Sequence, residues 1–314
     1  MLEFDKGQYS TNIRDLKDFI TSVYVIISDL YTKVTPTSVK ERKNVQRLKM
    51  GDDEIITIAI VGELMSNDSE TAWYNFCVKN LSDLFPSFCD RTRFNRIRRN
   101  LQSIINEIRK EINRLIQPTE TQIIDSLPLP VCKFGRAAFH KNFRSYGASY
   151  GKCASKKETY LGYKLHLLCN LDGYPSDFLL TPANIDDRKP VIELLEYQDQ
   201  LMKYLLADKG YVGVEFRQEI ALKTDVTMYP LPKSGDYQPD SEKFLRRFIF
   251  KKRRRIETTG SQFVDQLNLQ RVRAKSFWGL ITRLFTKFLA FDIAYLINVV
   301  NGNDHPIKIK SLIF

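Results

Sequence analysis

The sequence predicts an α/β protein in two parts, an all-helical part followed by a mixed sheet with helices. Up to residue 117 the apolar residues recur at steps of three and four, which is typical of one face of a helix. After Gln117-Pro118-Thr119 the period changes to alternation and to short apolar runs, which are typical of strands. We therefore expect one domain over residues 1–117 and a second over residues 118–314, each long enough to bury a core.

Three amphipathic helices are expected in the first part. Apolar residues share one helical face over residues 13–30. A second helix is expected after Asn67, where Glu70 follows three residues on as in a capping box. A third is expected after Asp90, because an apolar seam runs without interruption over residues 94–115.

The first turns of the helix after Asp90 carry a cluster of arginines. A helix, a turn and a second helix that starts with arginines resemble a helix-turn-helix reader, which places its second helix in the major groove of DNA. The alternative is a solvated charged face on an ordinary helix, which is the usual role of a charge run. The candidate DNA-binding residues of this helix are Arg91, Arg93, Arg96, Arg98 and Arg99.

Strand and helix signals alternate in the second part. The expected elements are a strand at 163–169, a hairpin turn at Asp172-Gly173, a returning strand at 178–180, a helix over 186–200, a strand ending at Asp208, a helix over 216–222, a strand over 226–231 and a last helix over 276–298. A mixed sheet with helices on both faces fits this order, which is that of an RNase H-like core. The last helix is expected to pack on the core or in a dimer contact.

A basic and aromatic segment interrupts this pattern. Residues 133–157 contain seven Lys or Arg and no Asp or Glu. Basic residues among aromatics suit phosphates and unstacked bases, and a loop of this length is more often functional than an ordinary surface loop. We expect a mobile arm that orders over DNA. Its candidate DNA contacts are Lys133, Arg136, Lys141 and Arg144. On the following strand, Lys164 and His166 alternate with apolar residues and are expected to face solvent or DNA.

Three acidic residues occur in settings that suit a metal ligand. Asp125 lies in an apolar strand-like run, Asp208 ends another, and Glu257 follows a run of arginines. An Asp at the end of a buried strand is costly to desolvate unless it is paired, and a divalent cation is one such partner. Taken singly, the two Asp could be turn residues and Glu257 could pair with Arg253 one helical turn earlier. Taken together, they indicate two-metal phosphodiester chemistry.

Charge and composition limit the function classes. Lys and Arg exceed Asp and Glu by 48 to 37, so the net charge is +11 and a polyanion is the expected partner. The five cysteines are scattered, without a Cys-x-x-Cys pair, which indicates reduced thiols in a cytoplasmic protein. No signal peptide is evident at the N-terminus. The apolar stretch 277–300 contains Arg283, Lys287 and Asp292, which a membrane-spanning helix would rarely tolerate.

Five phrases of the sequence resemble, in the same order, the bacterial DDE insertion-sequence transposases. They are IIDSLPLPVC (123–132), YLGYKLHLL (160–168), LTPANIDDR (180–188), LADKGY (206–211) and RRRIETTGSQ (253–262). The branch to which they are most similar is the one named for insertion sequence nine-eight-two. Within that resemblance Phe250 stands where a tyrosine is usual and Val264 where a lysine is usual. Gly260 is a further departure, which indicates either a bend near the site or a degraded copy.

The resemblance implies that Asp125, Asp208 and Glu257 form a DDE triad that holds Mg²⁺, or Mn²⁺ in its place. It implies that Arg253 is the arginine four positions before the glutamate, and that Arg253 and Lys209 contact DNA. The implied reaction is hydrolysis at the terminal inverted repeats of an element, followed by attack of the freed 3′ hydroxyl on target DNA. A homodimer is expected. An RNase H-like nuclease or junction resolvase would share the triad without the joining step, and a DNA-binding repressor would need no metal.

Overall fold

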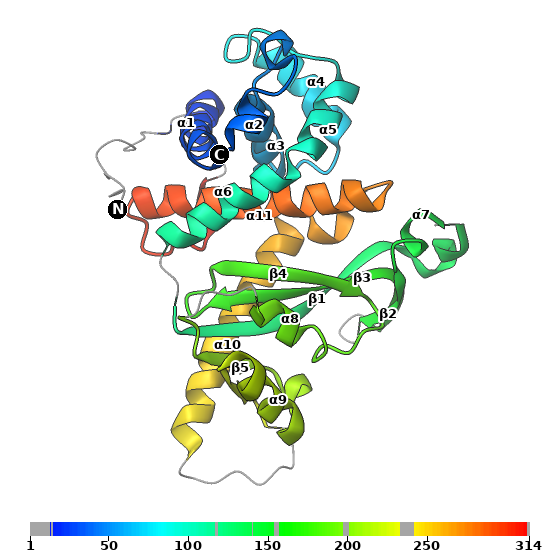
Figure 1. Ribbon diagram of the computed structural model, residues 1–314, viewed down its shortest axis with the longest axis vertical. Coiled ribbons are helices and arrows are strands. Elements are labelled where there is room, and N and C mark those ends of the chain that lie inside the picture. Colours follow the sequence, from blue (N-terminus) through cyan, green and yellow to red (C-terminus); the bar gives the residue numbers. More distant parts are fainter. Residues whose placement is uncertain are drawn as a thin grey trace. The chain divides into compact units, whose positions relative to one another are not determined.

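The computed structural model describes residues 13, 15–116, 119–139, 141–153, 157–196, 201–232 and 242–312. The chain divides into two compact units (Figure 1). The helical unit comprises Met1–Ile116 together with Asp265–Phe314, and the α/β unit comprises Gln117–Val264. The C-terminal segment, expected with the second part of the sequence, therefore belongs to the helical unit.

Helices α1, α3, α5, α6 and α11 form the centre of the helical unit. The described α-helices are α1 (Leu16–Val34), α2 (Thr37–Lys40), α3 (Asp52–Leu64), α4 (Glu70–Asn80), α5 (Arg91–Asn100), α6 (Gln102–Leu115) and α11 (Phe277–Val300), and the described 3-10 helices are η1 (Val45–Arg47), η5 (Leu269–Arg271) and η6 (Ile309–Leu312). The last long helix, α11, packs against α3 and α6, which places residues from the two ends of the chain in one core (Figure 1).

The helix ends follow local capping signals. The Asp90 side chain accepts a hydrogen bond from the backbone N–H of Arg93 at 2.9 Å and so begins α5. Ser69 caps α4, which therefore begins at Glu70 rather than directly after Asn67. The helix expected to run on from Asp90 is two helices, because the backbone leaves helical geometry at Leu101.

The charged residues of α11 are buried in ion pairs. Arg283 pairs with Glu63 at 3.3 Å, and Lys287 donates to the same carboxylate. Asp292 pairs with Arg109 at 3.1 Å. These pairs explain how α11 lies in a protein core despite its charges. No helix in the described ranges is long and apolar enough to cross a membrane.

The α/β unit is built on a curled mixed sheet. Its described elements are β1 (Thr121–Lys133), η2 (Phe134–Phe139), α7 (Lys141–Arg144), β2 (Ser149–Cys153), β3 (Glu158–Asn170), β4 (Pro175–Pro182), α8 (Val191–Glu196), β5 (Tyr204–Ala207), η3 (Lys209–Tyr211), α9 (Val214–Thr224), β6 (Thr227–Pro230) and α10 (Lys243–Asp265). The strand order is β2-β3-β1-β5-β6, and β4 pairs with β3 beside β2. Strands β1, β5 and β6 are mutually parallel, whereas β2, β3 and β4 pair antiparallel.

Helices cover both faces of this sheet. Ile124 of β1 packs in a core with residues of α8 and α9, among them Val191 and Ile220. Side chains alternate along a strand, so Asp125 and Leu127 both lie on the face opposite to that of Ile124. On that face Leu127 contacts Gly260 of α10. The acidic residue of β1 therefore points to the α10 face.

Several sequence predictions of individual elements are confirmed and others need correction. The hairpin is confirmed, with Leu165 of β3 opposite Leu180 of β4. Helix α8 is shorter than expected, and residues 197–200 of the expected helix lie outside the described residues. Residues 133–153 are not an unstructured arm, because η2, α7 and the edge strand β2 form there. Residues 140 and 154–156 of that segment lie outside the described residues.

Candidate active site

Asp125 and Asp208 lie at the same level of two parallel strands. Ile124 of β1 is the partner of Ala207 of β5, and each aspartate is the next residue of its chain segment. Asp208 also begins η3, because its carboxylate accepts a hydrogen bond from the backbone N–H of Lys209 at 2.7 Å. The register of one strand pair thus brings together two acidic residues that are 83 positions apart.

Helix α10 adds Arg253 and Glu257 to these two aspartates. The Arg253 guanidinium donates to the Glu257 carboxylate at 2.6 Å, as expected for residues one helical turn apart. Another of its nitrogens lies 3.5 Å from Oδ2 of Asp125. Its Nε atom lies 3.8 Å from Oδ1 of Asp208. Three carboxylates from three different elements therefore surround one guanidinium.

Burial and like charge alter the acidity of Asp125. The pKa of its carboxyl is raised to about 6, chiefly by burial and to a smaller extent by the carboxylates of Asp208 and Glu257. The backbone N–H of Ser126 and the Arg253 guanidinium act in the opposite direction. Burial disfavours the charged form of this carboxyl, and a nearby cation stabilises that form. The position therefore suits a positive charge.

Carboxylates are suitable ligands for a divalent cation, but Arg253 provides the positive charge among them in this structure. Carboxylate oxygens are the ligands that Mg²⁺ prefers. In the described part of the chain, no group of three or more His, Cys, Asp or Glu is arranged so that it could hold a metal ion. A cation bound by Asp125, Asp208 and Glu257 would therefore have to compete with the ion pairs of Arg253.

Helix α10 is held close to the sheet beside the acidic cluster. A Cβ atom on Gly260 would lie 3.1 Å from Cδ2 of Leu127, so a glycine permits this approach. The neighbouring Thr259 hydroxyl donates to the carbonyl oxygen of Gly173 at 2.6 Å. Helix α10 continues through Gly260, so close packing against Leu127 is sufficient to explain this glycine.

The basic residues expected around the site differ in their availability. Lys209, next to Asp208, is exposed. Lys164 is half-buried and donates to Asp187 at 2.8 Å and to the carbonyl of Ile185 at 2.6 Å. The expectation for His166 is wrong: it is fully buried, and its Nε2 lies 2.9 Å from the Thr181 hydroxyl. The alternation of polar and apolar residues wrongly predicted an exposed His166, because both faces of β3 are covered at this position.

The basic segment after β1 presents its cationic residues to solvent. Lys133, Arg136, Lys141 and Arg144 are all exposed. Arg144 is held locally, because it donates to the Tyr150 hydroxyl at 2.7 Å and lies over the Tyr150 ring at 5.4 Å. These residues form the basic surface near the β2 edge of the sheet.

The arginines of α5 do not all point outward. Arg91, Arg96 and Arg99 are exposed and Arg93 is half-buried, which suits contact with DNA. Arg98 is buried and its guanidinium pairs with Glu70 of α4. Arg98 is therefore buried between α4 and α5 and is not one of the exposed arginines of the helix.

Tyr211 is a neighbour of the cluster that the sequence did not single out. It follows Asp208 by three residues and is buried. Burial raises the pKa of its hydroxyl well above the usual value, and the carboxylates of Asp125, Asp187 and Asp208 add to this effect. Its position in a turn directly after an acidic strand end was the available signal.

Comparison with known proteins gives a match over the α/β unit and its flanks. The family model of the "Transposase DDE domain" matches residues 115–277. Neither a curated protein nor a solved structure matches the chain. The matched range includes Asp125, Asp208, Arg253 and Glu257.

Proposed function

Because this chain belongs to the family of the transposase DDE domain, whose model matches more than half of its residues, we propose that it is an insertion-sequence transposase of the nine-eight-two branch. The proposal includes hydrolysis at the ends of the element and joining of the freed 3′ hydroxyl to target DNA. The observation that carries it is the convergence of three carboxylates on Arg253. We further propose that the α/β unit is an RNase H-like core, and that the protein acts as a homodimer in the bacterial cytoplasm.

In this proposal Asp125, Asp208 and Glu257 hold a divalent cation, Mg²⁺ or Mn²⁺. When bound, the cation activates the attacking oxygen and stabilises the charge on the phosphate. Arg253 would offer its guanidinium to a phosphate oxygen. The 2.6 Å bond from Arg253 also orients Glu257, which is otherwise half exposed at the surface of α10.

DNA binding is assigned to the basic surfaces of both units. The family implies DNA as partner, and the net charge of +11 agrees with a polyanionic ligand. In the helical unit, exposed arginines of α5 would bind the phosphate backbone of the duplex. In the α/β unit, the segment after β1 and Lys209 would contact phosphates near the cleaved bond. The proposed contacts are Arg91, Arg93, Arg96, Arg99, Lys133, Arg136, Lys141, Arg144 and Lys209.

The test is incubation of the full chain with the DNA that flanks its gene, Mg²⁺ and a supercoiled target. Cleavage and joining are scored on gels, and DNA binding is measured separately. Asp125→Asn, Asp208→Asn and Glu257→Gln are each expected to abolish both reactions while DNA binding survives. Glu215→Gln removes an exposed carboxylate of α9 in the same unit and is the matched control.

The same experiment separates the alternatives. Cleavage without joining would identify a nuclease or a junction resolvase. Binding of flanking DNA without cleavage, by a protein that is properly folded, would identify a repressor. Near-normal cleavage by any one of the three carboxylate variants would remove that residue from the proposed triad.

A further inference from the structure

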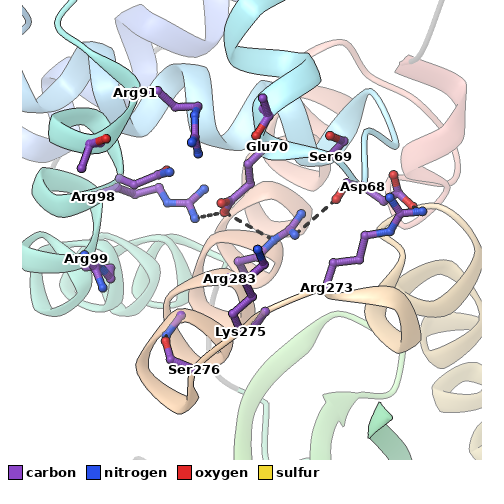
Figure 2. Close-up of a pocket in the computed structure, with 15 residues that line it drawn as sticks. Asp68, Ser69, Glu70, Arg91, Arg98, Arg99, Arg273, Lys275, Ser276 and Arg283 are labelled. Atoms are coloured by element: carbon purple, nitrogen blue, oxygen red, sulfur yellow. Dashed lines mark hydrogen bonds and ion pairs between the residues drawn. The ribbon is translucent and has the colours of Figure 1, made fainter. Parts of the chain in front are cut away.

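A polar pocket lies in the helical unit, beside the arginines of α5. The pocket has a volume of about 540 Å³ and is formed by α4, α5, the segment before α11 and the start of α11 (Figure 2). This volume is within the range of small-molecule binding sites. All residues that line it belong to the helical unit.

The lining of this pocket is strongly cationic. Six basic and two acidic side chains line it, so its net charge is four positive. The two carboxylates are already paired, Asp68 with Arg273 at 2.8 Å and Glu70 with Arg98. The six basic residues are Arg91, Arg98, Arg99, Arg273, Lys275 and Arg283. Among the described residues no ion pair joins Arg91, Arg99 or Lys275 to a carboxylate, so three positive charges are left for a ligand.

Three helix N-termini contribute to the same pocket. Ser69 at the start of α4, Arg91 at the start of α5 and Ser276 at the start of α11 all line it. The first backbone N–H groups of a helix have no partner within the helix and carry partial positive charge. One such group in α4 and one in α11 are capped by the serine hydroxyls. The remaining partial charges favour an anion.

A buried arginine in the wall also lacks a full set of partners. Arg98 is 5% exposed, and its Nε–H has no hydrogen-bond partner within the described structure. In Figure 2 the Arg98 side chain is directed toward Glu70 in the pocket, beside Arg283 of α11. Arg98 thus contributes its positive charge to the wall of the pocket, next to Arg283.

The chemistry of the lining selects phosphate over a base or an apolar group. Among the described residues, none of those that line the pocket is aromatic, so it offers no ring on which a base could stack. Arginine side chains and helix N-termini are the groups that proteins use for phosphate oxygens.

We propose that this pocket binds a phosphate group of the DNA backbone and so anchors the helical unit on the duplex. The proposal rests on DNA being the ligand of the proposed transposase. It adds Lys275 to the DNA contacts and gives Arg91 and Arg99 a shared phosphate. The anchor joins residues before and after the catalytic segment in the sequence.

The test compares DNA binding by the full chain and by the double variant Arg99→Ala/Lys275→Ala. Both side chains are exposed and have no carboxylate partner among the described residues, so folding should be preserved. The affinity for a duplex is measured at several KCl concentrations. A single phosphate contributes about −0.9 to the slope of log K against log salt concentration, so the double variant should have a slope shallower by about 0.9. Its Kd should rise about tenfold, as expected when a charged hydrogen bond is lost.

The matched control is Lys43→Ala/Lys79→Ala, which removes the same charge from two exposed positions of the helical unit outside the pocket. Its slope should equal that of the wild type. A second arm measures Tm in sodium phosphate and in sodium chloride of equal ionic strength. The DNA anchor would be overturned if phosphate raised the Tm of the wild type but not that of the Arg99→Ala/Lys275→Ala variant, and if the two proteins bound DNA with equal affinity. Free phosphate would then be the ligand.

Failure of this proposal differs from failure of the proposed function. A wild type that cleaves DNA, with equal salt slopes in pocket and control variants and no pocket-dependent Tm rise, would overturn the pocket and leave the transposase standing. A second outcome is that the wild type binds no DNA, while phosphate raises the Tm of the wild type and not that of the Arg99→Ala/Lys275→Ala variant. This outcome would overturn the transposase proposal and would show that the phosphate in the pocket does not come from DNA. A slope change confined to the pocket variant supports the anchor.

Discussion

Gly260 of α10 lies so close to Leu127 of β1 that a Cβ atom on the glycine would be 3.1 Å from the leucine Cδ2 atom. Leu127 is two residues after Asp125 and points to the same face of the strand. Glu257 and Arg253 precede Gly260 on α10 by about one and two helical turns. The close approach at Gly260 therefore brings α10 against the same face of β1 on which Arg253 lies 3.5 Å from the carboxylate of Asp125.

We predict that Gly260→Leu destabilises the protein, because added methylene groups at a tight contact cost about 1–3 kcal/mol. Gly260→Ala should stay within about 1 kcal/mol of the wild type, since its better helix propensity offsets the close contact. The free energy of unfolding in urea measures both. Ser261→Leu places the same side chain at the exposed neighbouring position and should cost much less. Equal stability of the two leucine variants would contradict the close packing.

Much of the secondary structure could be predicted because its signals are local. The β3–β4 hairpin follows from alternation and from the Asp172-Gly173 turn, and both are present. The helix α3 was not predicted. Its residues from Ile55 to Leu64 are all buried, so the sequence shows no polar face and no helical period. Helix α11, equally buried, could be predicted as a helix but not assigned to the helical unit, because that depends on contacts with α3 and α6.

The candidate site could be predicted only in part, because some of its features depend on contacts between residues that are distant in the sequence. The positions of Asp125 and Asp208 at strand ends are visible in the sequence, and the parallel pairing of β1 with β5 makes them neighbours. The burial of Arg98 could not be predicted from a run of arginines. It depends on Glu70, a residue 28 positions earlier that belongs to another helix.

Arg253 is predicted to stabilise the acidic cluster when no divalent cation is bound. Arg253→Ala leaves three carboxylates close together without a compensating charge, so its Tm in EDTA should be lower than that of the wild type. Added Mg²⁺ should raise the Tm of this variant more than that of the wild type, because the cation no longer competes with a guanidinium. Differential scanning fluorimetry with and without Mg²⁺ gives both values. The control is Arg254→Ala, an exposed neighbour on α10. An identical Mg²⁺ response of the two variants would argue against the role of Arg253.

His166 is predicted to stay neutral down to low pH. Burial is the main effect that lowers its pKa, to about 4, with Lys164 acting in the same direction and Asp187 against it. The pKa in the unfolded chain is about 6.5, so between these values the unfolded state binds more protons and this residue lowers stability as pH falls. NMR of ¹³C-labelled imidazole rings should show one histidine signal that titrates near pH 4, and His166→Gln should remove that signal. A midpoint near 6.5 would contradict the prediction.

The pH dependence of stability provides a second readout for His166. The raised pKa of Asp125 acts in the opposite direction, because a folded state with a pKa of about 6 binds more protons than an unfolded one near 3.9. The wild-type curve therefore contains both effects. The difference between wild type and His166→Gln isolates the histidine. This difference should change between about pH 6.5 and 4 and be constant above that window.

The buried pairs of Glu63 are predicted to be essential for the helical unit. Glu63 is 4% exposed and is the carboxylate for both Arg283 and Lys287 of α11, and Lys287 also donates to the carbonyl of Leu267. Removing one partner of a buried pair leaves an uncompensated charge and costs about 3–5 kcal/mol.

Glu63→Ala should therefore lower the free energy of unfolding by about that amount, as measured by urea denaturation. Glu63→Gln should fall between this variant and the wild type, because the amide oxygen still accepts a hydrogen bond although the charge is lost. Asp83→Ala breaks the exposed pair with Lys17 and should cost at most about 1 kcal/mol. If Glu63→Ala cost no more than Asp83→Ala, the charges of α11 would have to be stabilised by other groups, and the account of how this helix lies in a core would fail.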